Sequence, residues 1–317
     1  MGLKIERWYK VFSDGSHNAF TDVCWFRGSP YCTFRHATNH LSEDGRVLVL
    51  RGSPDGSRWQ VMASIRGPAD TRDPKLMPTP DGLLCYSFVA LHDPGGSRFS
   101  AGCSLSRDGE TWGPWRLIEE DLIYWRPRWH DGRGYVAAYG VQDCTVVFKS
   151  TVDGLTWDDV SALAQREGQE CPNETAFDFG SDGVCWALVR RECGEGHPLL
   201  ARSDPPYTRW TRVELAIKLQ GPCLWLVGEQ VYISGRWYQP GGHVNTAIFR
   251  LDGIQPVCQV VLPSGGDTSY MGAARHPQDD RRYWLTYYSS HEYSPRVNSH
   301  EHPADVFICD VLFDDEY

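Results

Sequence analysis

Short runs of alternating apolar and polar residues follow one another along the whole chain, separated by clusters of Asp, Gly, Ser and Pro. The runs at 20–26, 31–35 and 46–51 set this pattern near the start, and each is too short for an amphipathic helix. A period of two is typical of β-strands with one buried face, and the intervening clusters favour tight turns. The pattern predicts an all-β chain of short antiparallel strands.

One turn sequence recurs at a regular spacing. It reads SRDGETW at 106–112, SPDGSRW at 53–59 and STVDGLTW at 150–157, with a worn fourth copy at 203–210. Asp next to Gly suits a tight hairpin, and the following Trp suits packing between sheets. We therefore expect Trp59, Trp112 and Trp157 to be buried beside their turns. The period of roughly 45 to 53 residues is that of one propeller blade.

The three good copies resemble the Asp-box, or BNR repeat, of the sialidase superfamily, whose consensus is S-x-D-x-G-x-T-W. The middle residue is missing from two copies and displaced in the third. The resemblance extends over most of the chain. It implies a six-bladed β-propeller of four-stranded antiparallel blades, in a single domain over residues 1–317. Six blades of about 50 residues fill a chain of this length.

The last blade needs a strand from the other end of the chain. Its expected strands at 270–275, 283–288 and 306–313 leave it one strand short, and residues 4–12 alternate as the missing outer strand requires. Closure of this kind removes exposed sheet edges. We therefore expect both ends of the sequence to lie in the sixth blade.

The charge of the chain limits the kinds of binding partner, and its cysteine content indicates the cellular compartment. The net charge of −10 argues against a nucleic acid or an anionic membrane as partner, because no basic tract is present. No apolar run reaches the roughly 18 residues of a membrane-spanning helix, and charged residues interrupt the first twelve positions, unlike a signal peptide. The eleven cysteines include no C-x-x-C pair. Free thiols in a reducing compartment are therefore favoured, and we expect a cytoplasmic protein.

No motif points to a metal or a cofactor. His17, His243 and His291 lack the spacing of metal ligands, and the sequence contains no phosphate-binding loop, dinucleotide fingerprint or G-x-S-x-G motif. Aromatic residues make up 13% of the chain, which suits stacked sheets and also a carbohydrate site. The sequence thus predicts a carbohydrate partner and no metal or cofactor.

The starts of the inner strands are the expected place for chemistry, because inner strands line a propeller's central channel. These positions are rich in charge and read Thr21-Asp22, Arg72-Asp73-Pro74, Trp125-Arg126-Pro127, Asn173-Glu174, Gly221-Pro222 and Asp267-Thr268-Ser269-Tyr270.

In the sialidase family a Tyr at the start of the sixth blade is the nucleophile, and a Glu from the fourth blade removes its proton. Tyr270 and Glu174 stand at those places. A phenol with a pKa of about 10 needs such a base. The alternatives are a rim tyrosine bonded to backbone and a glutamate that caps a turn.

The family also binds the substrate carboxylate with three arginines, because a planar guanidinium matches a carboxylate. Arg190 resembles the second of them, since it follows Glu174 by sixteen residues. Arg191 competes with Arg190, because neighbouring strand residues face opposite ways. Arg236 resembles the third. Solvated cations at strand ends are the alternative reading.

The first arginine is where the sequence departs from the family. The family's R-I-P belongs to the first inner strand, but residues 20–23 contain no arginine. An echo, Arg72-Asp73-Pro74, stands one blade later, and Asp93 follows at about the distance of the family's acid/base Asp. This departure argues against sialic acid itself as the substrate, but not against a pocket for an acidic sugar.

Four further residues follow the second strand of the first blade or face the channel. His40, with Arg35 and His36, lies where a proton donor would be convenient, and Arg126 could contact an acidic substituent. The candidate catalytic residues are therefore Tyr270, Glu174, Asp73, Asp93 and His40. The candidate substrate-binding residues are Arg35, Arg72, Arg126, Arg190, Arg191 and Arg236.

The sequence as a whole predicts a retaining, sialidase-like exo-glycosidase that acts on an acidic or sialic-acid-like terminal sugar. One alternative is a polysaccharide or oligosaccharide lyase that uses Tyr or His at a uronate. The other is a carbohydrate-binding propeller without catalysis. The sugar, the linkage and the oligomeric state are left open.

Overall fold

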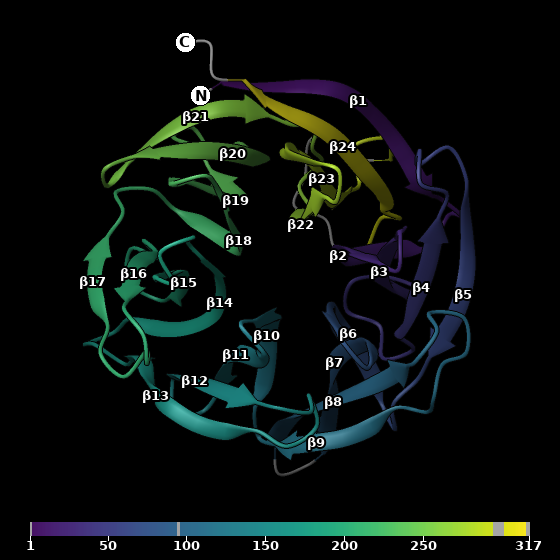
Figure 1. Ribbon diagram of the computed structural model, residues 1–317, viewed down its shortest axis with the longest axis horizontal. Coiled ribbons are helices and arrows are strands. Elements are labelled where there is room, and N and C mark those ends of the chain that lie inside the picture. The colour runs from purple at the N-terminus through teal and green to yellow at the C-terminus, as the bar shows by residue number, and fades with distance from the viewer. Residues whose placement is uncertain (1, 94–95, 294–300, 315–317) are drawn as a thin grey trace. The chain divides into compact units, whose positions relative to one another are not determined.

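The computed structural model describes residues 2–93, 96–293 and 301–314 (Figure 1). Within these ranges the chain forms strands β1 to β24 and no helix. The strands pair into six four-stranded antiparallel sheets. These sheets are the blades of a six-bladed β-propeller, so the predicted fold class is confirmed. None of the described residues forms a helix long and apolar enough to cross a lipid bilayer.

The chain divides into two compact units. Unit 1 comprises Met1–Asp121 and Pro263–Tyr317, and unit 2 comprises Leu122–Leu262. The single domain expected over residues 1–317 stays a prediction.

Unit 1 contains the first, second and sixth blades. The first blade is β2 (His17–Phe26), β3 (Ser29–Ala37), β4 (Arg46–Gly52) and β5 (Trp59–Ile65). The second blade is β6 (Asp70–Thr79), β7 (Gly82–Asp93), β8 (Gly96–Ser106) and β9 (Arg116–Glu120). The sixth blade is β22 (Thr268–His276), β23 (Asp279–Ser289), β24 (Asp305–Asp314) and β1 (Gly2–Phe12).

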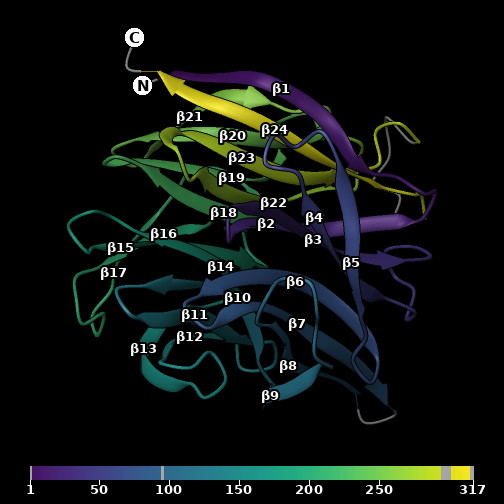
Figure 2. The same ribbon diagram turned by 45° about the vertical axis from the view of Figure 1, so that its right-hand side comes forward.

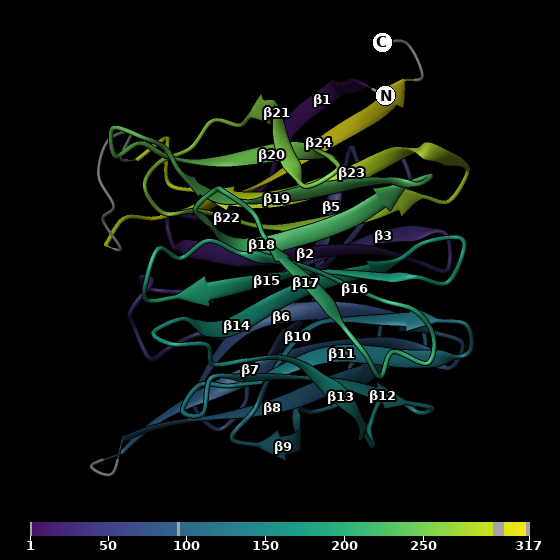
Figure 3. The ribbon, with the colours of Figure 1, turned by 90° about the vertical axis from the view of Figure 1, so that its left-hand side faces the viewer.

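Unit 2 contains the third, fourth and fifth blades. The third blade is β10 (Ile123–His130), β11 (Arg133–Gly140), β12 (Thr145–Thr151) and β13 (Asp158–Gln165). The fourth blade is β14 (Cys171–Phe179), β15 (Cys185–Glu192), β16 (Leu199–Ser203) and β17 (Thr211–Glu214). The fifth blade is β18 (Leu219–Val227), β19 (Gln230–Tyr238), β20 (Val244–Asp252) and β21 (Gln255–Val261). Figure 3 shows these strands one above another, from β21 at the top down to β18.

The sixth blade closes with the first strand of the chain, as expected. In Figure 2 the purple β1 runs beside the yellow β24, and the two pair antiparallel from Gly2 opposite Asp314 to Phe12 opposite Val306. The inner strand of this blade packs closely on that of the first blade. A Cβ added at Gly272 on β22 would lie 2.7 Å from the Asp22 Cα on β2, so only glycine permits this approach.

The recurrent turns are built from one set of hydrogen bonds. The Asp108 carboxylate accepts bonds from the backbone N–H groups of Glu110 and Thr111, both at 2.8 Å. Asp153 repeats this at 2.7 and 2.8 Å with the two residues that follow its glycine. The backbone bonds lower the pKa of Asp108 to about 2, so this carboxylate is ionised near neutral pH. The glycine after each Asp has positive φ, as the Asp-Gly pair predicts.

The turn tryptophans are less buried than expected. Trp59, Trp112 and Trp157 are half-buried, whereas Trp210 of the worn copy is buried. They stand at or before the outermost strands, whose second face meets solvent, and this leaves part of each ring exposed. Trp59 and Trp112 still pack against buried apolar clusters of their unit.

The expectation of free thiols is corrected at one pair. Cys144, before β12, forms a disulfide with Cys171 at the start of β14. Nothing in the sequence spacing marked this pair, because the fold joins residues of two different blades. The other nine cysteines are free, and seven of them are buried. The cytoplasmic location stays a prediction.

Candidate functional site

Each inner strand carries a bulge at the same place. The ladder with the second strand skips two residues in every blade, and the skipped pairs are Phe20-Thr21, Asp73-Pro74, Arg126-Pro127, Asn173-Glu174, Gly221-Pro222 and Tyr270-Met271. Several of these residues have positive φ, among them Phe20, Asp73, Arg126 and Tyr270. Non-glycine residues rarely adopt this conformation, and such strain gathers at functional sites.

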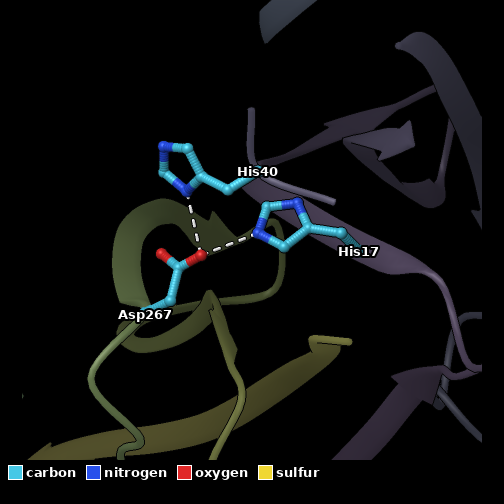
Figure 4. Close-up of side chains that lie close together, drawn as sticks. All are labelled: His17, His40 and Asp267. Carbon is cyan, nitrogen blue, oxygen red and sulfur yellow. Dashed lines mark hydrogen bonds and ion pairs between the residues drawn. The ribbon is translucent and has the colours of Figure 1, made fainter. Parts of the chain in front are cut away.

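In unit 1 the carboxylate of Asp267 is a hydrogen-bonding centre (Figure 4). Its Oδ2 lies 2.7 Å from His17 Nε2 and 2.9 Å from His40 Nδ1. Its Oδ1 accepts a bond of 2.7 Å from the Tyr288 hydroxyl. Asp267 is 1% exposed. A buried carboxylate is tolerated here because both of its oxygens are occupied by donors.

The two histidines of this cluster differ in their access to solvent. The His17 side chain is fully buried, whereas that of His40 is 15% exposed. Burial lowers the pKa of His17, with help from the charges of Arg35 and Arg72, although Asp267 opposes this shift. His17 is therefore a neutral imidazole near neutral pH. His40 is the member of the pair that solvent reaches.

An aromatic side chain joins this cluster to Tyr270. The Phe20 ring centroid lies 5.2 Å from that of His40, 5.5 Å from that of Tyr288 and 4.9 Å from that of Tyr270. Tyr270 is 7% exposed, and its backbone carbonyl accepts a bond of 2.9 Å from the Thr21 hydroxyl. The predicted nucleophile thus lies in the same packed group as the histidines.

Arg35 and Arg72 share one carboxylate. Arg35 Nε donates to Asp70 at 3.0 Å, and Arg72 Nε donates to the other oxygen of Asp70. Both Nη atoms of Arg35 and Nη2 of Arg72 also donate to backbone carbonyls of the loop between β3 and β4. Both arginines, expected to bind substrate, are therefore engaged by groups of unit 1.

In unit 2 the predicted base Glu174 is ion-paired. Arg190 lies 2.7 Å from the Glu174 carboxylate and also pairs with Glu192. Arg191 instead pairs with Glu214 and donates to the His197 carbonyl at 2.6 Å. Arg190 is thus the arginine that lies on the same side of its strand as Glu174. Opposite facing of neighbouring strand residues explains the division.

The remaining candidates lie on separate elements. Arg126, 2% exposed, donates from Nε to the Pro222 carbonyl at 2.9 Å within unit 2. Arg236 on β19 is 6% exposed. Asp73 is 8% exposed at the bulge of β6. The side chain of Asp93 lies outside the described residues. The predicted link between Tyr270 and Glu174 joins residues of different units and stays a prediction.

Three residues of the cluster have the donor types of a metal site. One ligand atom from each of His17, His40 and Asp267 lies within 4.8 Å of the others, although no metal was expected from the sequence. Tetrahedral zinc with bonds of about 2.0 Å needs ligand atoms about 3.3 Å apart. The observed separations of 2.7 and 2.9 Å are those of hydrogen bonds. The geometry favours a hydrogen-bonded cluster.

Sequence reasoning missed His17, Asp267 and Tyr288 as members of this site. Asp267 stood among the expected inner-strand residues but received no role. His17 was considered only as a metal ligand. A polar residue at the start of an apolar inner strand was the available signal for both.

Comparison with known proteins finds no matching family model and no matching curated protein. Solved structures do match. A protein of unknown function from Dyadobacter fermentans is 19% identical with a TM-score of 0.78, over 99% of this chain and 100% of that one. The Penicillium chrysogenum alpha-L-arabinanase, complexed with arabinobiose, is 13% identical with a TM-score of 0.72, over 97% and 98% of the two chains.

Trypanosoma rangeli sialidase is 11% identical with a TM-score of 0.65. The match covers 93% of this chain but only 55% of the sialidase, so the chain spans about half of that protein. These similarities show the fold alone. Chemistry has to be argued from the side chains, and those of unit 1 combine a strained Tyr with a carboxylate that holds two imidazoles.

Proposed function

We propose that the protein is a glycoside hydrolase that removes an acidic terminal sugar, with Tyr270 as its nucleophile. One observation carries the proposal: Tyr270 stands at a strained inner-strand bulge and packs through Phe20 against the cluster of Asp267. The likeness of the fold to an arabinanase and a sialidase supports a carbohydrate substrate.

The proposed reaction follows from the limits of a phenol as nucleophile. Tyr270 becomes reactive only when a base takes its proton, and the proposal assigns this role to Glu174. The phenol oxygen attacks the anomeric carbon, and the bond to the departing sugar breaks. Water then releases the sugar from Tyr270, which gives net retention. A neutral nucleophile avoids repulsion from a carboxylate on the substrate, which is why sialidases depart from the two-carboxylate scheme.

Arginines of unit 2 are the proposed contacts for the acidic group. Arg35 and Arg72 are held by Asp70 and by the loop between β3 and β4. Arg126, Arg190 and Arg236 lie on the inner or second strands of the unit 2 blades, and Arg190 also contacts Glu174, the proposed base. A guanidinium binds a carboxylate through two parallel hydrogen bonds. Arg191 is a weaker candidate for binding substrate, because it pairs with Glu214. Asp73 is a weaker candidate for catalysis, because the proposed reaction assigns it no step.

Product analysis with a panel of sialosides, uronosides and neutral glycosides tests the reaction class. We expect release of a reducing acidic sugar. Tyr270→Phe removes only the oxygen and should reduce turnover by orders of magnitude. Glu174→Gln should reduce turnover nearly as much, and the double variant should be no slower than Tyr270→Phe alone, because the two residues act as a unit. Tyr287→Phe is the matched control, since this buried hydroxyl donates to the Pro263 carbonyl, between β21 and β22.

A fluorinated activated substrate should trap a covalent adduct on Tyr270, detected by peptide mass. An active Tyr270→Phe protein, or an adduct on another residue, would show that the nucleophile is wrongly assigned.

The second candidate is a lyase acting at a uronate, and the cluster of Asp267 favours it. A histidine held by a carboxylate can remove the proton beside the uronate carboxyl group. The same panel separates the two reactions, because elimination yields an unsaturated sugar that absorbs in the near ultraviolet. Binding of a sugar without any product would instead indicate a carbohydrate-binding propeller.

A further inference from the structure

The loop that carries His40 is held at several points. Arg35 donates to the Asn39 carbonyl at 3.1 Å and to the Ser42 carbonyl at 2.5 Å. Arg72 donates to the carbonyl of His40 itself at 2.5 Å. Because both guanidinium groups also bind Asp70, the loop is attached to the start of the second blade.

The same loop is closed upon itself and against β6. Asp44 accepts bonds from the backbone N–H and the hydroxyl of Thr38. Burial alone would raise the pKa of Asp44, but hydrogen bonds from Ser42 and Thr38 bring it well below its usual range. Thr71 N–H donates to the Gly45 carbonyl at 3.1 Å. Such a density of contacts is unusual for a surface connection and fixes the position of His40.

The ring of His40 is fixed as well. Asp267 accepts from Nδ1, and in Figure 4 the second ring nitrogen points away from this carboxylate. A carboxylate that accepts from Nδ1 holds a histidine in one tautomer and stabilises its imidazolium form. Tyr288 occupies the other oxygen of Asp267, so the carboxylate cannot rotate without losing a bond.

We propose that His40 is the acid that protonates the departing sugar oxygen, and that Arg35, Asp70 and Arg72 are positioning residues that hold its loop in place. This inference rests on the proposed glycosidase function. It chooses His40, one of the proton donors expected from the sequence, over Asp93, which the resemblance suggested. It also gives Arg35 and Arg72 a role that does not require contact with substrate.

The proton balance of this step closes without another reagent. As the bond between the anomeric carbon and the leaving oxygen breaks, the imidazolium of His40 gives its Nε2 proton to that oxygen. Neutral His40, still donating from Nδ1 to Asp267, then accepts a proton from the water that attacks the anomeric carbon. The ring returns to its starting state, and Tyr270 recovers its proton from Glu174.

His17 does not fit this role, although it binds the same oxygen of Asp267. Its side chain is fully buried and its pKa is lowered, so it remains neutral and has no access to a substrate. Its bond to Oδ2 makes Asp267 less basic and so keeps the proton on His40. His17 is therefore a second positioning residue for the imidazole.

The test compares leaving groups on whichever sugar the product panel identifies. A nitrophenol or methylumbelliferone departs without protonation, whereas an alkyl alcohol or a sugar needs it. We expect His40→Gln to slow cleavage of alkyl and sugar glycosides by about 10²-fold or more, the usual contribution of a general acid, and to leave aryl glycosides much less affected. Arg72→Ala should show a weaker form of the same selectivity, and Arg72→Lys should restore part of it.

His36→Gln is the matched control, because His36 lies on β3 in the same blade and pairs with Asp14 at 2.9 Å instead of with Asp267. The effect of His36→Gln on the cleavage rate should be the same for all leaving groups. Equal slowing of all substrates by His40→Gln in an otherwise active enzyme would overturn the assignment and leave the proposed function intact. Wild-type protein that cleaves no glycoside would overturn both. Loss of activity on chelation, restored by Zn²⁺, would replace the acid with a metal site.

Discussion

Replacing Asp267 by Asn removes the charge of the hydrogen-bonding centre and changes little else in its shape. The carboxylate accepts three bonds of 2.7, 2.9 and 2.7 Å from His17, His40 and Tyr288. An amide can still accept from the two histidines, and the Tyr288 hydroxyl can turn to accept from its N–H group. The substitution therefore isolates the contribution of the negative charge.

The cost follows from the difference between charged and neutral hydrogen bonds. Bonds to a charged group contribute about 1.5–3 kcal/mol each and neutral ones about 0.5–1.5, so three bonds lose about 3 kcal/mol. Relief of the buried charge recovers part of this, and we expect a net loss of about 2 kcal/mol. For a unit of this size that corresponds to a melting temperature lower by about 4–8 °C.

Scanning calorimetry of the whole protein measures this shift, with cleavage rates recorded below the transition. Asp310→Asn is the matched control, because Asp310 is a buried carboxylate of the sixth blade that pairs with Arg7 and Arg282. Both variants should lose stability, but only Asp267→Asn should lose activity on substrates with poor leaving groups. The reasoning is refuted if Asp267→Asn melts with the wild type, or if Asp310→Asn is equally inactive.

Three further outcomes are expected. As the pH falls below the ordinary pKa of 6.5, His17 takes up a proton in the unfolded chain but not in the native protein, because its native pKa is lowered. The stability of the protein should therefore fall as the pH falls through that range. His17→Gln should flatten the dependence of the melting temperature on pH, measured between about pH 5 and 8. A thiol reagent should modify two cysteines in the native protein and nine in the unfolded, unreduced protein, with all eleven reacting only after reduction. Gly45→Ala places a Cβ against the Asp70 carboxylate and should lower the melting temperature and the activity together, whereas Gly113→Ala, with its nearest contact at 3.4 Å, should change neither.

The fold was predictable from the sequence because its signals are local. Alternation of apolar residues, Asp-Gly turns and a short last blade each follow from a few neighbouring positions, and they predicted the strands and the pairing of β1 with β24. The half-buried tryptophans were misjudged because exposure depends on what covers an outermost strand. No local pattern reports that.

The site was only partly predictable, since its contacts join distant residues. His17 and Asp267 are 250 positions apart, and nothing near either one signals the other. Arg35 was correctly placed on the second strand of the first blade, but its pairing with Asp70 depends on where the next blade begins. The disulfide between Cys144 and Cys171 escaped prediction for the same reason. The residue types at the starts of the inner strands indicate where a functional site forms, but they do not show which side chains bond to one another.

The pairing of β1 with β24 also bears on how the molecule is made. Unit 2 is one continuous stretch whose strands pair with their neighbours in sequence, so it can form as soon as Leu262 has left the ribosome. Unit 1 has to wait, because β1 has no partner strand until β24 is synthesised. Ordering such distant segments costs loop-closure entropy and slows folding. Since β22 must dock on β2 to bring Asp267 to the two histidines, a nascent chain can assemble this cluster only after β22 has been synthesised.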